Sequence, residues 1–128
     1  MKENKITVII DKSIEEVFEF TINPKNTPTR ISSIVEEIAD EYPPKIGTKY
    51  KNRGEKWDRD FYKFIEFEKN KMFILTDLDE NYHVKYTYKK LEDNKTEVEY
   101  FEWMKEGELS KPFTEDVLIR LKNVMEKD

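Results

Sequence analysis

The apolar positions between residues 112 and 125 recur at helical spacing, which predicts a long amphipathic helix near the C-terminus. Pro112 suits the first helical turn, where a missing N–H group costs nothing. Glu115 and Asp116 would then lie near the positive end of the helix dipole. One face of this helix must be buried against another layer, and its apolar residues are Phe113, Val117, Leu118, Leu121, Val124 and Met125.

Most of the remaining chain alternates between apolar and polar residues, as strands do. Residues 82–90 are the clearest case, because four apolar residues from Tyr82 to Tyr88 share one face and His83 lies on the other. Short turns separate consecutive segments, so the sheet should be antiparallel. The predicted strands are Lys5–Ile10, Ser33–Asp40, Thr48–Arg53, Trp57–Phe67, Met72–Thr76, Tyr82–Lys90 and Thr96–Met104.

Two short helices are expected between the first two strands. Ser13 and Glu16 form a capping box at the start of the first helix, and Pro24 ends it at about Asn23. Residues 25–30 leave room for at most one further turn. The pattern therefore predicts an α+β fold in which a curved antiparallel sheet of seven strands wraps around the C-terminal helix.

Composition limits the possible partners of this chain. Its 128 residues fit one domain spanning residues 1–128, and an aromatic content of 13% argues against disorder. The net charge of -5 disfavours nucleic acids and anionic membranes. The chain has no cysteine, and no apolar run approaches the length of a membrane span. We therefore expect a cytoplasmic protein without a cofactor, a metal or a membrane span.

Four short segments carry a resemblance to a known family. They are VIIDKSIEEVF at 8–18, PKIGT at 44–48, FIEFEKNK at 64–71 and NKTEV at 94–98. Together with the element order, they resemble the START-like (SRPBCC, birch-pollen-allergen-like) superfamily, in particular its polyketide cyclase/dehydrase and lipid-transport group. The resemblance covers nearly the whole chain and implies a helix-grip fold with a cavity between the sheet and the long helix.

The resemblance implies no catalytic residue, because the superfamily includes binders, transporters, cyclases and chaperone cofactors. Many relatives carry a tryptophan after the second short helix, where this chain has Arg30 and Ile31. This departure should alter the mouth of the cavity.

The tyrosines form the strongest candidate site. They combine apolar area with a polar tip, which suits a cavity for an amphipathic molecule, although core packing would explain them equally well. Glu102 follows Val98 and Tyr100 on the inner face, where a buried carboxylate would need a polar partner. We therefore expect Glu102 in water at the mouth of the cavity. The candidate ligand-binding residues are Tyr50, Tyr62, Tyr86, Tyr88, Tyr100, Glu102, Phe113, Val117 and Leu121.

Other polar residues are weaker candidates. His83 is the only histidine and is expected to face solvent. Asp58 and Asp60 share a face with Tyr62 and are expected at a solvated strand end. Residues 77–81 begin like a calcium loop, but the positions that require glycine and glutamate are tyrosines, so an acidic hairpin tip is the better interpretation.

A basic run with interleaved aromatic residues could bind nucleic acid. The preceding acidic strand should pair with it, however, and this pairing would neutralise the run. The basic residues are Lys45, Lys49, Lys51, Arg53, Lys56 and Arg59, and the acidic ones are Glu36, Glu37, Asp40 and Glu41.

These observations favour the binding of a small hydrophobic or amphipathic molecule, lipid- or polyketide-like, between the sheet and the long helix. One alternative is a cyclase/dehydrase-type enzyme, which a buried Glu102 hydrogen-bonded to a tyrosine would favour. Another is an interaction module resembling chaperone activators, which a cavity filled by side chains would favour. The ligand and the oligomeric state do not follow from the sequence.

Overall fold

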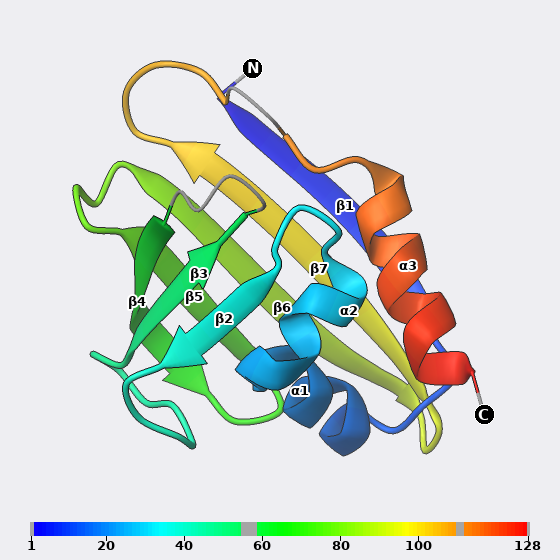
Figure 1. The fold of residues 1–128 in the computed structure, drawn as a ribbon. Helices are drawn as coiled ribbons and strands as arrows, with labels where there is room; N and C mark the ends of the chain where they lie inside the picture. The colour runs from blue at the N-terminus through cyan, green and yellow to red at the C-terminus, as the bar shows by residue number, and fades with distance from the viewer. Residues whose placement is uncertain (1, 55–58, 110–111, 128) are drawn as a thin grey trace.

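The structure is a computed structural model that describes residues 2–54, 59–109 and 112–127. Its strands form one curved antiparallel sheet in the order β1-β7-β6-β5-β4-β3-β2, so that the first strand pairs with the last (Figure 1). This arrangement confirms the predicted fold class. The strands are β1 (Glu3–Ile10), β2 (Glu36–Ala39), β3 (Lys49–Arg53), β4 (Arg59–Glu68), β5 (Met72–Asp77), β6 (Tyr82–Glu92) and β7 (Lys95–Met104). Trp57 and Asp58, which were predicted to begin the fourth strand, lie outside the described residues.

The helices pack against the sheet in two groups. The first group lies between β1 and β2 and comprises α1 (Ile14–Ile22), the 3-10 turn η1 (Pro24–Asn26) and α2 (Thr27–Arg30). The second is the single helix α3 (Glu115–Glu126), which follows β7. α1 contacts β6 and β7, whereas α3 lies along β1 and touches α2 (Figure 1). Among the described residues, no helix combines the length and the apolar character that crossing a membrane requires.

Local sequence determines where α1 begins and ends. The Ser13 hydroxyl accepts a hydrogen bond from the Glu16 backbone N–H at 3.2 Å, which confirms Ser13 as the N-cap. The Glu16 carboxylate accepts from the Ser13 hydroxyl at 3.0 Å instead of from the backbone N–H that the predicted capping box requires. The helix ends at Ile22 with Asn23 as its C-cap, which agrees with the end that Pro24 predicted at about Asn23. The side chain of Asn23 then accepts from the Lys25 N–H at 3.0 Å and starts the next turn.

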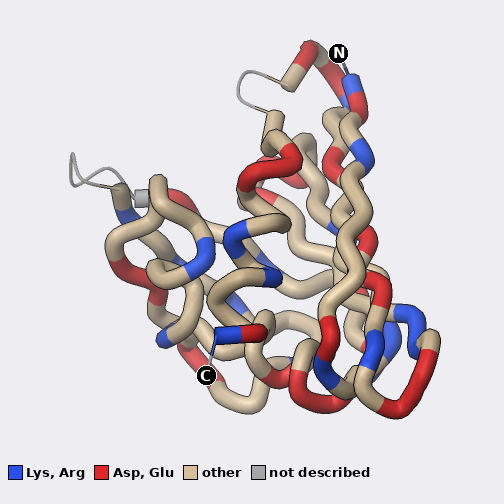
Figure 2. Tube along the Cα trace, turned by 90° about the vertical axis from the view of Figure 1, so that its right-hand side faces the viewer, with Lys and Arg blue, Asp and Glu red and all other residues tan. Residues whose placement is uncertain are grey.

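The acidic and basic strands pair as expected. Glu36 of β2 lies opposite Arg53 of β3, with 3.3 Å between the carboxylate and the guanidinium Nε. Lys45 and Glu41 form a second ion pair at 3.5 Å in the connection between these strands. Acidic and basic positions are interspersed along the chain in Figure 2. The absence of nucleic-acid binding stays a prediction.

The predicted start of the C-terminal helix at Pro112 is wrong. The helix begins at Glu115, and residues 112–114 are not helical. The Phe113 N–H donates to the Glu102 carboxylate at 2.7 Å, and the Asn4 amide donates to the Phe113 carbonyl at 2.7 Å. The backbone of Phe113 is therefore bonded to the sheet and is not part of a first helical turn.

Aromatic side chains fill much of the space between the helices and the sheet. The ring of Phe18 on α1 packs edge-on against Phe67, Phe73 and Tyr88, with ring centroids 5.0 to 6.3 Å apart. Aromatic pairs in this geometry add to the stabilisation from buried area. The half of the sheet beneath α1 is therefore a packed core.

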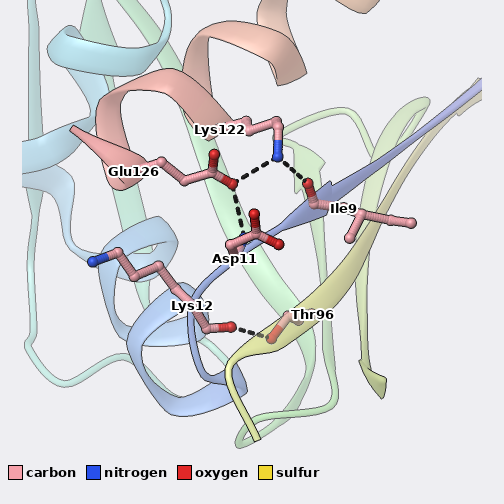
Figure 3. A network of polar contacts seen from close by, with 6 residues as sticks. All are labelled: Ile9, Asp11, Lys12, Thr96, Lys122 and Glu126. Carbon is pink, nitrogen blue, oxygen red and sulfur yellow. Dashed lines mark hydrogen bonds and ion pairs between the residues drawn. The ribbon is translucent and has the colours of Figure 1, made fainter. Parts of the chain in front are cut away.

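The C-terminal half of α3 is held on the end of β1 by a polar network (Figure 3). The Lys122 ammonium donates to the Ile9 carbonyl at 2.8 Å and to the Glu126 carboxylate at 2.7 Å. The same carboxylate accepts from the Asp11 N–H at 2.8 Å. Nearby, the Thr96 hydroxyl donates to the Lys12 carbonyl at 2.9 Å.

Truncation of Leu121 tests whether α3 is packed as described. Leu121 is fully buried, whereas Ile119 on the same helix is 45% exposed. We expect Leu121→Ala to lower the free energy of unfolding by about 2–5 kcal/mol because it leaves a cavity. Ile119→Ala should change it by less than about 0.5 kcal/mol. Urea denaturation measures both values, and equal losses would contradict the packing of α3 on β1.

The network around Glu126 predicts a dependence of stability on pH. Hydrogen bonds from the Asp11 N–H and from Lys122 lower the pKa of Glu126 below its usual 4.5. A group whose pKa is lowered by folding stabilises the protein above the unfolded pKa and loses that contribution as the pH falls through the folded value.

We therefore expect the unfolding free energy of the wild type to fall more steeply than that of Glu126→Gln between about pH 5 and pH 3. Urea melts at several pH values measure the two curves. Parallel curves would show that the Glu126 network contributes nothing.

Candidate functional site

A cavity of about 290 Å³ lies between the sheet and the segment that contains α1 and α2. Small-molecule sites span about 300–1,000 Å³, so this cavity suits a small ligand. Its exposed lining residues are Ser33 and Asp60, which mark the mouth, and Arg30 and Tyr86 lie on its buried side. None of its described lining residues belongs to α3, so the cavity lies beside that helix rather than beneath its centre.

The strands supply an apolar wall for the cavity. Phe73 and Tyr86 stack with ring centroids 4.9 Å apart, and Tyr100 meets Tyr86 edge-on at 5.2 Å. Leu75 and Val84 line the same wall. Successive inward-facing positions on β5, β6 and β7 therefore form a surface that is mainly aromatic.

The structure gathers five of the nine candidate ligand-binding residues around the cavity. Tyr50, Tyr62, Tyr86 and Tyr100 line it from the strands, and Phe113 lines it from the segment before α3. Phe113 stacks on Tyr100 with 4.7 Å between the ring centroids. Burial raises the pKa values of Tyr62 and Tyr100 above the usual pKa of a tyrosine. Both hydroxyls therefore stay protonated near neutral pH.

The remaining candidates lie elsewhere. Tyr88 packs against Phe18, and its hydroxyl is hydrogen-bonded to Thr21, so it belongs to the core beneath α1. Leu121 is buried in the core. Val117 lines a shallow groove that Arg30 also borders.

Glu102 is not in water, contrary to the expectation from the sequence. It is 1% exposed, and its carboxylate accepts three hydrogen bonds. The donors are the Tyr82 hydroxyl at 2.7 Å, the Asn4 amide at 2.9 Å and the Phe113 N–H at 2.7 Å. These partners meet the need of a buried carboxylate for hydrogen bonds, which the strand pattern could not reveal.

Tyr82 connects Glu102 to the cavity. Its hydroxyl lies 2.7 Å from the Glu102 carboxylate and 3.3 Å from the Tyr100 hydroxyl, and its side chain lines the cavity. Burial raises the pKa of Tyr82, and the neighbouring carboxylate raises it further, so the hydroxyl acts as a donor. Tyr82 shares a face of β6 with Tyr86. The alternation of apolar and polar residues along this strand could therefore have identified Tyr82 as a candidate ligand-binding residue.

The sequence analysis placed Arg30 at the mouth of the cavity but did not include it among the ligand-binding residues, and the structure shows that it is buried. Its guanidinium donates to the Tyr86 hydroxyl at 3.0 Å and to the Thr21 carbonyl at 3.2 Å, and it lies 5.4 Å from the centroid of the Tyr86 ring. Arg30 ends the very short helix α2, where no periodic pattern could show which way the side chain points.

Glu37 is the second charged residue of the cavity wall that sequence reasoning missed. Its carboxylate accepts from the Thr27 hydroxyl at 2.6 Å and from the Asn52 amide at 3.4 Å. Burial raises the pKa of Glu37, while the bond from Thr27 and the charge of Arg30 oppose this shift. Glu37 was assigned only to the acidic strand, where every second side chain faces inward.

The expectation that His83 faces solvent is wrong. His83 is 5% exposed because its ring stacks on Trp103 of β7, with 4.8 Å between the ring centroids. The side chain does lie on the sheet face opposite the tyrosines, so only its burial was mispredicted.

The described acidic residues near the hairpins form no metal site. Asp60 is exposed, and Asp58 lies outside the described residues. Asp77 accepts hydrogen bonds from the N–H groups of Asn81 and Tyr82, which fits a turn rather than an ion-binding loop. In the part of the chain that the structure describes, no three acidic or histidine side chains cluster in a way that could hold a metal ion.

Replacement of Glu102 tests its structural role. Glu102→Gln removes the charge that strengthens three hydrogen bonds, so we expect the free energy of unfolding to fall by about 1–3 kcal/mol. Glu99 lies on the opposite face of β7 in an exposed ion pair with Lys5, and Glu99→Gln should cost at most about 1 kcal/mol. Chemical denaturation compares the two variants, and a larger loss for Glu99→Gln would contradict this role.

Comparisons with known proteins support the fold. No protein-family model matches the sequence, and no curated protein matches it either. Solved structures do match. A conserved protein of unknown function from Enterococcus faecalis has a TM-score of 0.76 at 14% identity, with 98% of this chain and 71% of that chain covered.

Two further structures carry informative names. The Aha1 dimer from Colwellia psychrerythraea has a TM-score of 0.73 at 14% identity, covering 99% of this chain and 98% of that one. The di-domain ARO/CYC protein BexL has a TM-score of 0.66 at 10% identity, covering 81% of this chain and 36% of that one. At such low identity these likenesses show the fold alone, and that fold is the helix-grip arrangement shared by an ARO/CYC domain and an Aha1 protein.

Proposed function

We propose that the protein binds a small hydrophobic or amphipathic molecule, lipid- or polyketide-like in character, in the cavity beside α2. The observation that carries this proposal is an aromatic cavity of about 290 Å³ that no described side chain fills. A predominantly apolar cavity with a few convergent polar groups is typical of small-molecule sites.

The polar groups around the cavity support an amphipathic ligand. The Tyr100 hydroxyl is 3.3 Å from that of Tyr82, a weak contact that a ligand oxygen could replace. The hydroxyl of Tyr50, by contrast, is already bonded to the Ile22 carbonyl. A ligand would therefore place its apolar body against Phe73 and Leu75 and reach polar partners at the cavity ends.

A pair of matched variants tests this proposal. Leu75 lines the cavity, whereas its neighbour Ile74 lies on the opposite face of β5 and does not. Leu75→Trp should fill the cavity and weaken the binding of octanol and naphthol at least about tenfold. Ile74→Trp should leave their affinities within about twofold. Isothermal titration calorimetry measures the affinities, and thermal melts confirm that both variants fold.

Native mass spectrometry of the protein purified from its own host provides an independent measurement. A co-purifying small molecule that is absent from Leu75→Trp supports the proposal. No bound molecule, together with no affinity for octanol or naphthol, contradicts it and favours the interaction-module alternative, for which the Aha1 fold is the precedent.

The Tyr82–Glu102 hydrogen bond favours a second candidate, an enzyme of the cyclase/dehydrase type. In such an enzyme, tyrosine hydroxyls and a carboxylate would move protons on a polyketide-like substrate. The Glu102 carboxylate also accepts hydrogen bonds from Asn4 and from the Phe113 N–H. Glu102 lines a hollow beside the cavity rather than the cavity itself. Binding therefore remains the first proposal, and mass spectrometry of a linear poly-β-ketone incubated with the protein decides between them.

A further inference from the structure

The guanidinium of Arg30 is buried and has unused hydrogen-bonding capacity. Arg30 is 5% exposed, and its Nε–H has no hydrogen-bond partner among the described residues. A buried donor without a partner costs about 1–3 kcal/mol, and most such groups in folded proteins are paired. The unpaired Nε–H therefore points to a partner that the folded chain itself does not supply.

No carboxylate of the described residues is among the hydrogen-bond acceptors of Arg30. Its two hydrogen-bond acceptors, the Tyr86 hydroxyl and the Thr21 carbonyl, are both neutral. Glu37 acts on it electrostatically, but the Glu37 oxygens accept hydrogen bonds from Thr27 and Asn52. Arginine keeps its proton in proteins, so a buried positive charge remains beside the cavity.

Arg30 and the apolar wall belong to the same cavity. The guanidinium lies over the ring of Tyr86, which stacks on Phe73, and both aromatic residues line the cavity with Arg30. Leu75 and Val84 extend the apolar wall away from the charge. The cavity thus joins one cationic end to one apolar surface.

We propose that the ligand is a small amphipathic carboxylic acid, whose carboxylate accepts hydrogen bonds from Arg30 while its apolar body lies against Phe73, Leu75 and Val84. This inference rests on the proposed function and adds the chemical class of the ligand. The planar guanidinium can offer Nε–H together with an Nη–H to both oxygens of one carboxylate. The ligand would thereby satisfy the unpaired donor and balance the charge.

A monocarboxylate fits this cavity better than a phosphate. Arg30 is the only basic residue among the described lining residues, and Glu37 and Asp60 line the same cavity. A second negative charge on the ligand would be repelled by these two carboxyl groups without a second cation to offset it. A single carboxylate matches the single guanidinium.

Titration with octanoate and octanol tests the inference, because the two probes share one apolar chain and differ in the polar end. We expect calorimetry near neutral pH to give octanoate an affinity about tenfold to a hundredfold higher than that of octanol. Arg30→Gln should abolish this preference by weakening octanoate alone. Arg120→Gln, which changes an exposed arginine of α3, should leave both affinities unchanged.

The outcomes separate this inference from the proposed function. Equal affinities of the wild type for the two probes would overturn the carboxylate assignment and leave the binding function intact. Binding of neither probe would overturn both. A preference for octanoate that persists in Arg30→Gln would place the carboxylate elsewhere and would also overturn the inference.

A second measurement covers the case in which Arg30→Gln fails to fold, since Arg30 also ties α2 to Tyr86. The Nε–H resonance of Arg30 in the wild-type protein should shift on addition of octanoate and stay in place on addition of octanol. A resonance that does not respond to octanoate would contradict direct pairing. Arg30→Lys, which keeps the charge but lacks the planar fork, should retain only part of the preference for octanoate.

Discussion

The buried carboxylate of Glu102 is the constraint on which much of the architecture depends. A carboxylate removed from water must find hydrogen-bond donors, and here they come from β1, from β6 and from the segment before α3. The bond to the Phe113 N–H fixes where the chain returns to the sheet after β7. This bond also places the Phe113 ring on Tyr100, so one polar requirement determines both the start of α3 and one wall of the cavity.

The concave face of the sheet is divided between a filled half and an open half. Phe18 projects from α1 and occupies the space over Phe67 and Tyr88. α2 is too short to cover the other half in the same way, and the space beside it remains as the cavity. Arg30 lies at the boundary, where its bonds to Thr21 and Tyr86 join the two halves. The short helix thus provides both the space and the charged group of the candidate site.

The sequence was sufficient to predict the fold class and the inner faces of the long strands β6 and β7, because alternation is a local property of the chain. It was not sufficient to predict burial that depends on a distant partner. His83 is covered by Trp103, and Glu102 is satisfied by Asn4, at separations that no short-range pattern reports. The burial of Arg30 was missed because a helix of four residues has no periodicity. Tyr62, Tyr86 and Tyr100 were found because they lie on long strands, although Tyr82 on the same strand as Tyr86 was not among the candidates.

The attachment of α3 to β1 covers part of one exposed edge of the sheet. The first strand ends one edge of the sheet, and an open edge is a template for pairing with another chain. Lys122 covers the Ile9 carbonyl, and Glu126 covers the Asp11 N–H. An incoming strand would have to displace both side chains before it could extend the sheet there. We therefore expect α3 to hinder edge-to-edge pairing of two copies of the chain at this end of β1.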